Sequence, residues 1–159
     1  FLRMQGADFS GISLKGFLEA LASEVKANDT SLVSYRRQHE PPAAQIAAAD
    51  SAPLSLKELR RQFQELVSPQ SDIVVETGDS WFNGQKLRLP AGARYFFQMQ
   101  YGSIGWATGA TLGVSLGAAP GRRTLALIGD GSFQLTAQEV STMIRHDADA
   151  IIFRLNNRG

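Results

Sequence analysis

The sequence contains no cysteine, so this chain forms no disulfide or thiolate zinc site and offers no thiol nucleophile. Charged residues make up only 19% of its 159 residues, and the formal net charge is +1. So small a net charge gives no reason to expect nucleic acid or a membrane surface as a partner. The lack of cysteine agrees with a reducing compartment, and we expect a cytoplasmic protein. With 43% hydrophobic residues, the composition is that of an ordinary globular protein.

Charge is missing altogether from residues 95–121, where glycine recurs at every fourth position from Gly105 to Gly117. One interpretation is a membrane-spanning helix with a small-residue dimer face. Spanning needs about 20 predominantly apolar residues, however, and large aliphatic side chains are few in this stretch. We therefore favour a buried helix whose glycines allow another backbone to approach closely.

The first third of the chain shows two helical patterns separated by an aperiodic segment. Apolar spacing predicts a helix over residues 13–27, with Ser13 as its N-cap. Residues 31–53 lose this periodicity and contain Pro41-Pro42 and an alanine-rich run, which is typical of an interdomain linker. A second helix is predicted from Ser55-Leu56-Lys57-Glu58, because this sequence matches a capping box.

Three apolar runs that end in small polar residues predict parallel strands covered on both faces. The runs are residues 73–75, 125–128 and 151–155. Helical segments at about 102–117 and 135–146 separate them, and Thr136-Ala137-Gln138-Glu139 is a second capping-box pattern. The alternation predicts an α/β fold with an open, mostly parallel sheet flanked by helices, whose ligands bind at the carboxyl ends of the strands.

Two polar motifs follow the second and third predicted strands, Gly129-Asp130-Gly131-Ser132 and Asn156-Asn157. Asp130 and Asn157 are 27 positions apart, about the length of one βαβ unit, which brings the ends of two parallel strands side by side. A carboxylate and an amide oxygen would then share one crevice with the main-chain carbonyl of Gly159, as a magnesium–diphosphate site requires. Either motif alone is weak evidence, and Gly129-Asp130-Gly131-Ser132 alone is better explained by a tight turn in which Asp130 caps a helix. Together the two motifs favour the metal site.

These motifs also carry a resemblance to a known family. From about residue 54 to 159 the sequence resembles the diphosphate-binding domain of thiamine-diphosphate enzymes, and among them the pyruvate decarboxylase family. The segments that resemble the family are residues 76–83, 101–105, 108–113, 129–139 and 155–157. Residues 1–30 resemble, less specifically, the end of the family's middle domain. The resemblance implies a linker at 31–53 and a cofactor-binding domain at 54–159, truncated at its C-terminus.

The resemblance implies thiamine diphosphate and Mg²⁺ as cofactors, with residue roles assigned by position. Mg²⁺ would be held by Asp130, Asn157 and the main chain of Gly159. The remaining cofactor contacts would come from Asp79, Gly131, Ser132, Gly102, Ser103 and Ile104.

Two of these contacts have specific expected roles. The carbonyl of Gly102 would accept a hydrogen bond from the aminopyrimidine, and Ile104 would lie beneath the cofactor and force its V shape. The alternative for Ile104 is a core residue under a helix, and both interpretations bury it.

The activity that the resemblance implies is non-oxidative decarboxylation of a 2-oxo acid, with pyruvate converted to acetaldehyde and CO₂ by a homodimer or homotetramer. The family's catalytic glutamates and histidine pair come from segments not present here, so we expect no catalytic residue in this chain and no activity from it alone. His39 and His146 are its only histidines, and we expect neither to be catalytic. The chain opens at Phe1 without methionine and stops directly after a strand-like run, and we therefore expect a fragment.

Two alternatives to this assignment stay open, and a third has less support. The parent enzyme could be an indolepyruvate or phenylpyruvate decarboxylase, or the chain could be a non-catalytic cofactor-binding or interaction fragment. A dinucleotide-binding domain has less support, because no G-x-G-x-x-G follows the first predicted strand.

Two features depart from the family's pattern. Arg154 lies within a strand that should be buried, and an unpaired buried cation is very unfavourable. We therefore expect Arg154 to contact a carboxylate or to reach solvent, as it would on an edge strand. The segment His146-Asp147-Ala148-Asp149 is also more polar than the resemblance predicts.

Overall fold

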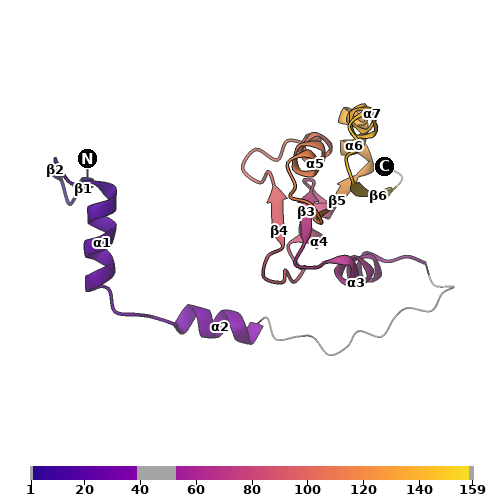
Figure 1. Cartoon of the computed structure of the whole chain (residues 1–159). Helices are drawn as coiled ribbons and strands as arrows, with labels where there is room; N and C mark the ends of the chain where they lie inside the picture. Colours follow the sequence, from indigo (N-terminus) through magenta and orange to yellow (C-terminus); the bar gives the residue numbers. More distant parts are fainter. Residues whose placement is uncertain (1, 39–52, 158–159) are drawn as a thin grey trace. The chain divides into compact units, whose positions relative to one another are not determined.

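The computed structural model describes residues 2–38 and 53–157, and the chain divides into two compact units, Phe1–Ala44 and Gln45–Gly159 (Figure 1). The elements of the first unit are an antiparallel hairpin, β1 (Leu2–Met4) with β2 (Ala7–Phe9), and two helices, α1 (Leu14–Glu24) and α2 (Thr30–Gln38). The hairpin was not predicted from the sequence.

The predicted helix over residues 13–27 corresponds to α1, which ends earlier, at Glu24. Ser13 is its N-cap, as predicted, and its Oγ accepts a hydrogen bond from the N–H of Gly16 at 3.0 Å. The first part of the expected linker is helical and forms most of α2, and the side chain of Asn28 accepts a hydrogen bond from the N–H of Thr30 at the start of this helix. Residues 39–52, with His39, lie outside the described residues.

The second unit is built on a four-stranded parallel sheet in the order β4-β3-β5-β6. Its strands are β3 (Ser71–Val75), β4 (Arg94–Phe97), β5 (Arg123–Gly129) and β6 (Ala150–Leu155). The α/β fold with a parallel sheet and the three predicted strands are therefore confirmed. The edge strand β4 was missed.

One face of the sheet is covered by α3 (Leu56–Leu66) and α4 (Asp79–Gly84), which lie below the sheet in Figure 1. Phe63 of α3 is 2% exposed and packs edge-on against Phe153 of β6, with ring centroids 5.1 Å apart. As predicted, α3 begins after Ser55, whose Oγ accepts a hydrogen bond from the N–H of Glu58 at 3.2 Å. The apolar face of α3 thus closes one side of the core.

The other face is covered by α5 (Trp106–Leu116), α6 (Asp130–Thr136) and α7 (Glu139–Arg145). α5 packs on this face through Ala107 and Ala110. Our expectation that the glycines of this helix allow close backbone approach is wrong for Gly109 and Gly113. Both are exposed, and a Cβ added at either would meet no atom within 4 Å. Alanine and threonine, not glycine, form the buried side of α5.

The single helix predicted over residues 135–146 is also wrong. α6 begins at Asp130, directly after β5, and α7 follows it from Glu139. The capping box expected at Thr136 does not form, because Thr136 is still the last residue of α6 and α7 begins only at Glu139; the Thr136 hydroxyl donates to the carbonyl of Gly105 at 2.7 Å. A tertiary hydrogen bond has replaced the local one.

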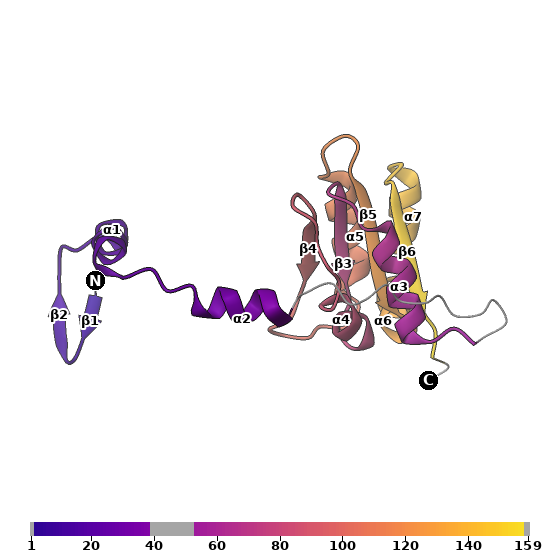
Figure 2. The same ribbon diagram turned by 90° about the horizontal axis from the view of Figure 1, so that it is seen from below.

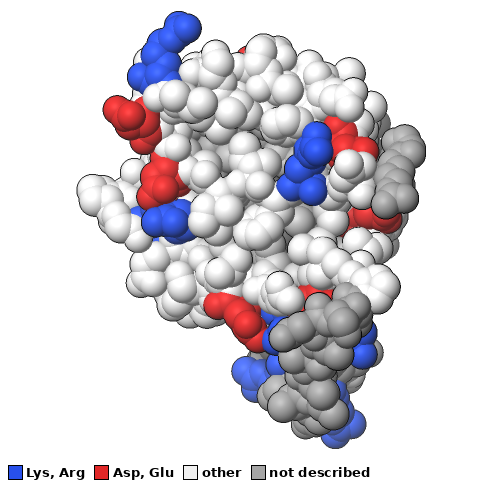
Figure 3. Space-filling view, turned by 90° about the vertical axis from the view of Figure 1, so that its right-hand side faces the viewer, with Lys and Arg blue, Asp and Glu red and all other residues white. Residues whose placement is uncertain are grey.

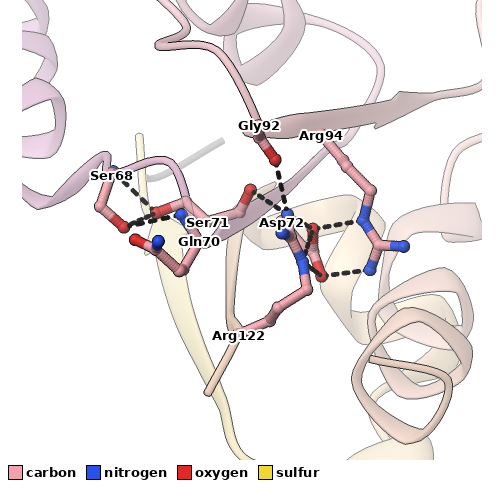
Figure 4. Close-up of polar contacts among 7 residues, drawn as sticks. All are labelled: Ser68, Gln70, Ser71, Asp72, Gly92, Arg94 and Arg122. Atoms are coloured by element: carbon pink, nitrogen blue, oxygen red, sulfur yellow. Dashed lines mark hydrogen bonds and ion pairs between the residues drawn. The ribbon is translucent and has the colours of Figure 1, made fainter. Parts of the chain in front are cut away.

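At the amino ends of the strands, Asp72 is fully buried and pairs with two arginines (Figure 4). Its carboxylate accepts a hydrogen bond from Arg94 Nε at 2.6 Å and from Arg122 Nε at 2.9 Å. Arg122 also donates to the carbonyls of Ser71 and Gly92, at 3.1 Å each. This cluster joins β3 to β4 and to the residue before β5, at the end of the sheet opposite to the carboxyl ends of the strands.

Strand β6 forms the other edge of the sheet, and Arg154 on it is exposed. Its cation therefore reaches solvent, one of the two outcomes expected from the sequence. Figure 3 views the molecule from this side, where charged side chains lie mainly around the margin of a mostly uncharged face. In the polar segment before β6, Asp149 forms an exposed ion pair with Arg123 at 3.2 Å, and His146 is exposed.

Across residues 2–38 and 53–157, no helix has the length and apolar character that a membrane span requires.

Candidate functional site

The neighbouring strands β3, β5 and β6 have their carboxyl ends on the same side of the sheet, and a polar segment follows each one (Figure 2). In the pairing register, Val75 of β3 lies opposite Leu127 of β5, and Gly129 of β5 lies opposite Leu155 of β6. Asp130 directly follows Gly129, and Asn156 directly follows Leu155. The parallel register therefore brings the two polar motifs to adjacent positions.

A cavity of about 880 Å³ opens at the carboxyl ends of these strands. This volume lies within the range of about 300–1,000 Å³ that is typical of small-molecule and cofactor sites. Its lining comes from the strand ends, the starts of α4 and α6, the loop before α5 and the start of α3: Leu54, Ser55, Leu56, Leu59, Thr77, Asp79, Ser80, Ile104, Gly129, Asp130, Gly131, Ser132, Ile152, Phe153, Arg154, Leu155, Asn156 and Asn157.

Six of the candidate residues from the sequence line this one cavity: Asp79, Ile104, Asp130, Gly131, Ser132 and Asn157. Gly102 and Ser103 do not line it, although they lie in the same loop as Ile104. The N–H of Ser103 donates to Gln98 Oε1 at 3.0 Å, and Gly102 has a φ of +58°. Gly159 lies outside the described residues.

Ile104 departs from the expectation that it is buried. Its side chain is 58% exposed, on the cavity surface, in the loop just before α5. Gly105 follows with a φ of +89°, which turns the chain into the helix and leaves Ile104 outside the core. The interpretation of Ile104 as a core residue is therefore wrong.

The donor atoms at this site suit a hard cation and a phosphate group. Asp130 offers a carboxylate and Asn157 an amide oxygen, and Mg²⁺ commonly takes one or two protein carboxylates and completes its shell with phosphate oxygens and water. Within the described ranges, no group of three or more His, Cys, Asp or Glu side chains lies close enough to hold a metal without such additional oxygens. Asp130 and Asn157 thus fit half of a magnesium–diphosphate site.

The surroundings of these donors leave room for a bulky anion. A Cβ added at Gly131 would meet no atom within 4 Å, so the main chain is open to close approach there. Ser80 also lines the cavity, and its buried Oγ has no hydrogen-bond partner among the described residues. Hydroxyl and main-chain donors of this kind are used to bind phosphate oxygens.

The sequence did not identify Glu76 or the lining from α3. Glu76 follows β3, is 1% exposed, and accepts hydrogen bonds from the N–H groups of Thr77 at 2.9 Å and of Gly105 and Ala107 at 3.0 Å. The end of the strand was visible in the sequence, but main-chain donors about thirty positions away leave no pattern in it. Leu56 was predicted only as part of a capping box, and Leu59 only as part of the apolar face of the helix that follows it.

Comparison with known proteins agrees with this geometry. Residues 76–159 match the family "Thiamine pyrophosphate enzyme, C-terminal TPP binding domain". Over 154 residues, or 97% of this chain, the sequence is 49% identical to pyruvate decarboxylase 1 of Pisum sativum and 47% identical to pyruvate decarboxylase 4 of Arabidopsis thaliana. The chain spans about a quarter of the length of these curated relatives, 26% and 25% respectively.

Among solved structures, the fold is similar to the X-ray structure of a protein from Mycobacterium smegmatis whose description assigns it to the thiamin diphosphate-dependent enzymes. The TM-score is 0.56 at 24% identity, over 73% of this chain and 24% of that one. This likeness supports the fold. Because the matched domain covers more than half of the sequence, the chain belongs to the thiamine pyrophosphate enzymes and carries their C-terminal TPP-binding domain.

Proposed function

We propose that this chain supplies the magnesium–diphosphate half-site of a thiamine-diphosphate-dependent decarboxylase that converts pyruvate to acetaldehyde and CO₂. The observation that carries this proposal is the placement of Asp130 and Asn157 in one cavity, at the ends of two adjacent parallel strands. The names of the relatives support pyruvate as the 2-oxo acid.

In this proposal, Mg²⁺ is held by the carboxylate of Asp130, the amide oxygen of Asn157 and the main-chain carbonyl of Gly159. Three protein oxygens and two diphosphate oxygens leave one position for water in an octahedral shell. The single carboxylate suits this role, because the diphosphate brings most of the negative charge.

The diphosphate is bound by the turn between β5 and α6 and by the start of α4. The N–H groups of Gly131 and Ser132 and the Ser132 hydroxyl donate to phosphate oxygens. Asp79, at the first position of α4, adds a contact from the neighbouring strand end. Both segments begin helices, so their first N–H groups have no partner within the helix.

The loop before α5 binds the other end of the cofactor. The carbonyl of Gly102 accepts a hydrogen bond from the exocyclic nitrogen of the aminopyrimidine, and Ser103 belongs to the same binding loop. Ile104 supports the cofactor from below, and its exposed side chain leaves water on binding, which favours the complex. Bound thiamine diphosphate supplies the electron sink for decarboxylation.

We further propose a cytoplasmic homodimer or homotetramer. Large apolar side chains are exposed on α4, on β4 and in the segment that follows it, beside the cavity residue Ile104. They are Phe82, Phe97, Met99 and Tyr101. An apolar surface of this kind is expected to contact another protein surface.

The test is equilibrium dialysis of the purified chain with thiamine diphosphate, with and without Mg²⁺. We expect saturable, Mg²⁺-dependent binding that Asp130→Ala abolishes. Asp149→Ala is the matched control, because this exposed carboxylate precedes β6 and lies at the amino end of the strands, away from the cavity at their carboxyl ends. Absence of saturable binding by the wild-type chain, or unchanged binding by Asp130→Ala, would contradict the proposal.

A further inference from the structure

Gly105 is hydrogen-bonded on both sides by elements that carry the site. Its N–H donates to Glu76 Oε2 at 3.0 Å, and its carbonyl accepts from Thr136 Oγ1 at 2.7 Å. Glu76 follows β3, and Thr136 ends the helix that begins with Asp130. We call Glu76, Gly105 and Thr136 the Gly105 junction; none of the three lines the cavity.

The junction leaves no space for a side chain at its centre. Gly105 has the left-handed φ of +89°, and an added Cβ would lie 3.0 Å from the Cβ of Leu135 and 3.5 Å from the carbonyl oxygen of Ser132. The backbone of the loop before α5 therefore packs directly against α6. Together with the hydrogen bond from Thr136 to the Gly105 carbonyl, this close packing couples the position of the loop to that of α6.

Glu76 holds the junction through main-chain groups alone. Its two carboxylate oxygens accept three hydrogen bonds, from the N–H groups of Thr77, Gly105 and Ala107. A buried carboxylate is tolerated only when such donors compensate its lost hydration. One side chain thus ties the end of β3 to the start of α5.

Resting on the function proposed above, we infer that Glu76 and Thr136 are positioning residues for the cofactor. Ile104 directly precedes Gly105 and faces the cavity from one side, while Asp130 and Ser132 of α6 line it from another. The junction sets the spacing between these two groups. A ligand that must contact both at once binds best when that spacing is fixed before binding.

The competing explanation is that Glu76 merely stabilises the fold. Asp72 provides the control, because it is a second buried carboxylate and lies in β3, at the end of the strand far from the cavity. Asp72→Asn removes a charge from buried hydrogen bonds as Glu76→Gln does, and it touches no residue of the junction.

The first measurement needs no cofactor and uses amide hydrogen exchange of the chain by mass spectrometry. Glu76→Gln replaces an acceptor oxygen with a donor, so at least one of the three N–H groups loses its partner. We expect exchange in the segment 101–109 to become about tenfold faster, as the loss of one charge-assisted hydrogen bond implies. Asp72→Asn should leave the exchange of this segment unchanged.

The second measurement is the Kd of thiamine diphosphate in the presence of Mg²⁺. Glu76→Gln and Thr136→Val should each raise it about tenfold, the equivalent of one lost hydrogen bond. Thr136→Ser keeps the hydroxyl and should stay within about twofold of wild type, as should Asp72→Asn. Thr136→Val changes the side-chain volume little, so this variant still tests the inference if Glu76→Gln fails to fold.

The outcomes separate the two proposals. Faster exchange in Glu76→Gln with an unchanged Kd would reduce the junction to a structural role and overturn the inference. Unchanged hydrogen exchange of the segment 101–109 in Glu76→Gln would show that the junction does not fix the loop, and it would also overturn the inference. A wild-type chain that binds no thiamine diphosphate would instead overturn the proposed function, and with it the role of the junction in binding.

Discussion

Asp72 and Glu76 are two buried carboxylates at opposite ends of strand β3, and different kinds of partner compensate their burial. Asp72 pairs with the guanidinium groups of Arg94 and Arg122, whereas Glu76 accepts hydrogen bonds from main-chain N–H groups. Loss of the first should therefore weaken the fold without altering the cavity. Loss of the second should alter the loop that carries Ile104.

Acid should weaken the fold through Asp72. Burial raises the pKa of Asp72, but hydrogen bonds and charge from Arg94 and Arg122 outweigh it and lower the pKa from 3.8 to about 2. Because the folded-state pKa is lowered, the stabilisation is fully present above about pH 4 and is lost as the pH falls toward 2. Asp72→Asn should reduce the free energy of unfolding at pH 6 by on the order of 2 kcal/mol.

Urea unfolding of wild type and Asp72→Asn between pH 6 and pH 2.5 checks this. The difference in unfolding free energy between the two proteins should shrink as the pH falls. A difference that stays constant over this range would mean that Asp72 does not titrate as its surroundings imply.

Ile104→Ala should separate binding from stability. The side chain is 58% exposed, so its truncation should change the free energy of unfolding by less than about 0.5 kcal/mol. It should nevertheless raise the Kd of thiamine diphosphate, because apolar support for the cofactor is removed. Ile73→Ala is the matched control: Ile73 is 0% exposed, and its truncation should cost about 2–5 kcal/mol of stability. A large loss of stability in Ile104→Ala would contradict its placement on the cavity surface.

Tyr95→Phe should be neutral or stabilising. The Tyr95 hydroxyl is buried and has no hydrogen-bond partner among the described residues, so its removal should change stability by between zero and about +1 kcal/mol. Burial also raises the pKa of Tyr95 from 10.0 to about 12. The unfolded phenol therefore ionises first, and wild type should lose stability above about pH 10 through this group.

Thermal unfolding of wild type and Tyr95→Phe at pH 7 and pH 10.5 tests both points. The advantage of the variant should grow with pH. Clear destabilisation by Tyr95→Phe at pH 7 would indicate a hydrogen bond that the hydroxyl makes elsewhere.

The chain alone should not release CO₂ from pyruvate. The cavity supplies binding groups for a metal and a diphosphate, but we assign no proton donor or acceptor for the reaction to this chain. The measurement is a CO₂ assay with saturating thiamine diphosphate and Mg²⁺, with binding confirmed on the same sample. CO₂ formation above the rate of a protein-free control would show that this assignment is incomplete.

The sheet was largely predictable because β3, β5 and β6 are continuous apolar runs with polar ends. Strand β4 was not, since Arg94 begins it and its four residues merge into the long uncharged stretch. The start of α6 was misplaced because Thr136 carries a capping signal. In the structure Thr136 instead ends α6 and donates a hydrogen bond to Gly105, 31 positions away.

The site was predictable to the extent that its groups follow strand ends. Asp130 and Asn157 could be paired by their spacing, because parallel strands align their ends. The role of Glu76 could not be predicted, because its partners are main-chain N–H groups, which every residue except proline possesses. Ile104 was expected to be buried, either beneath the cofactor or as a core residue under a helix. The turn at Gly105 that exposes it depends on the tertiary structure.

Arg154 also has a consequence for how the sheet assembles. It alternates along β6 with Phe153 and Leu155, which pack in the core beneath α3. Sliding β6 by a single residue would exchange the two sides of the strand and drive a guanidinium toward Phe63. Desolvating an unpaired cation there would be prohibitive. The arginine therefore selects against the misaligned sheet and favours the alignment in which Asn157 lines the same cavity as Asp130.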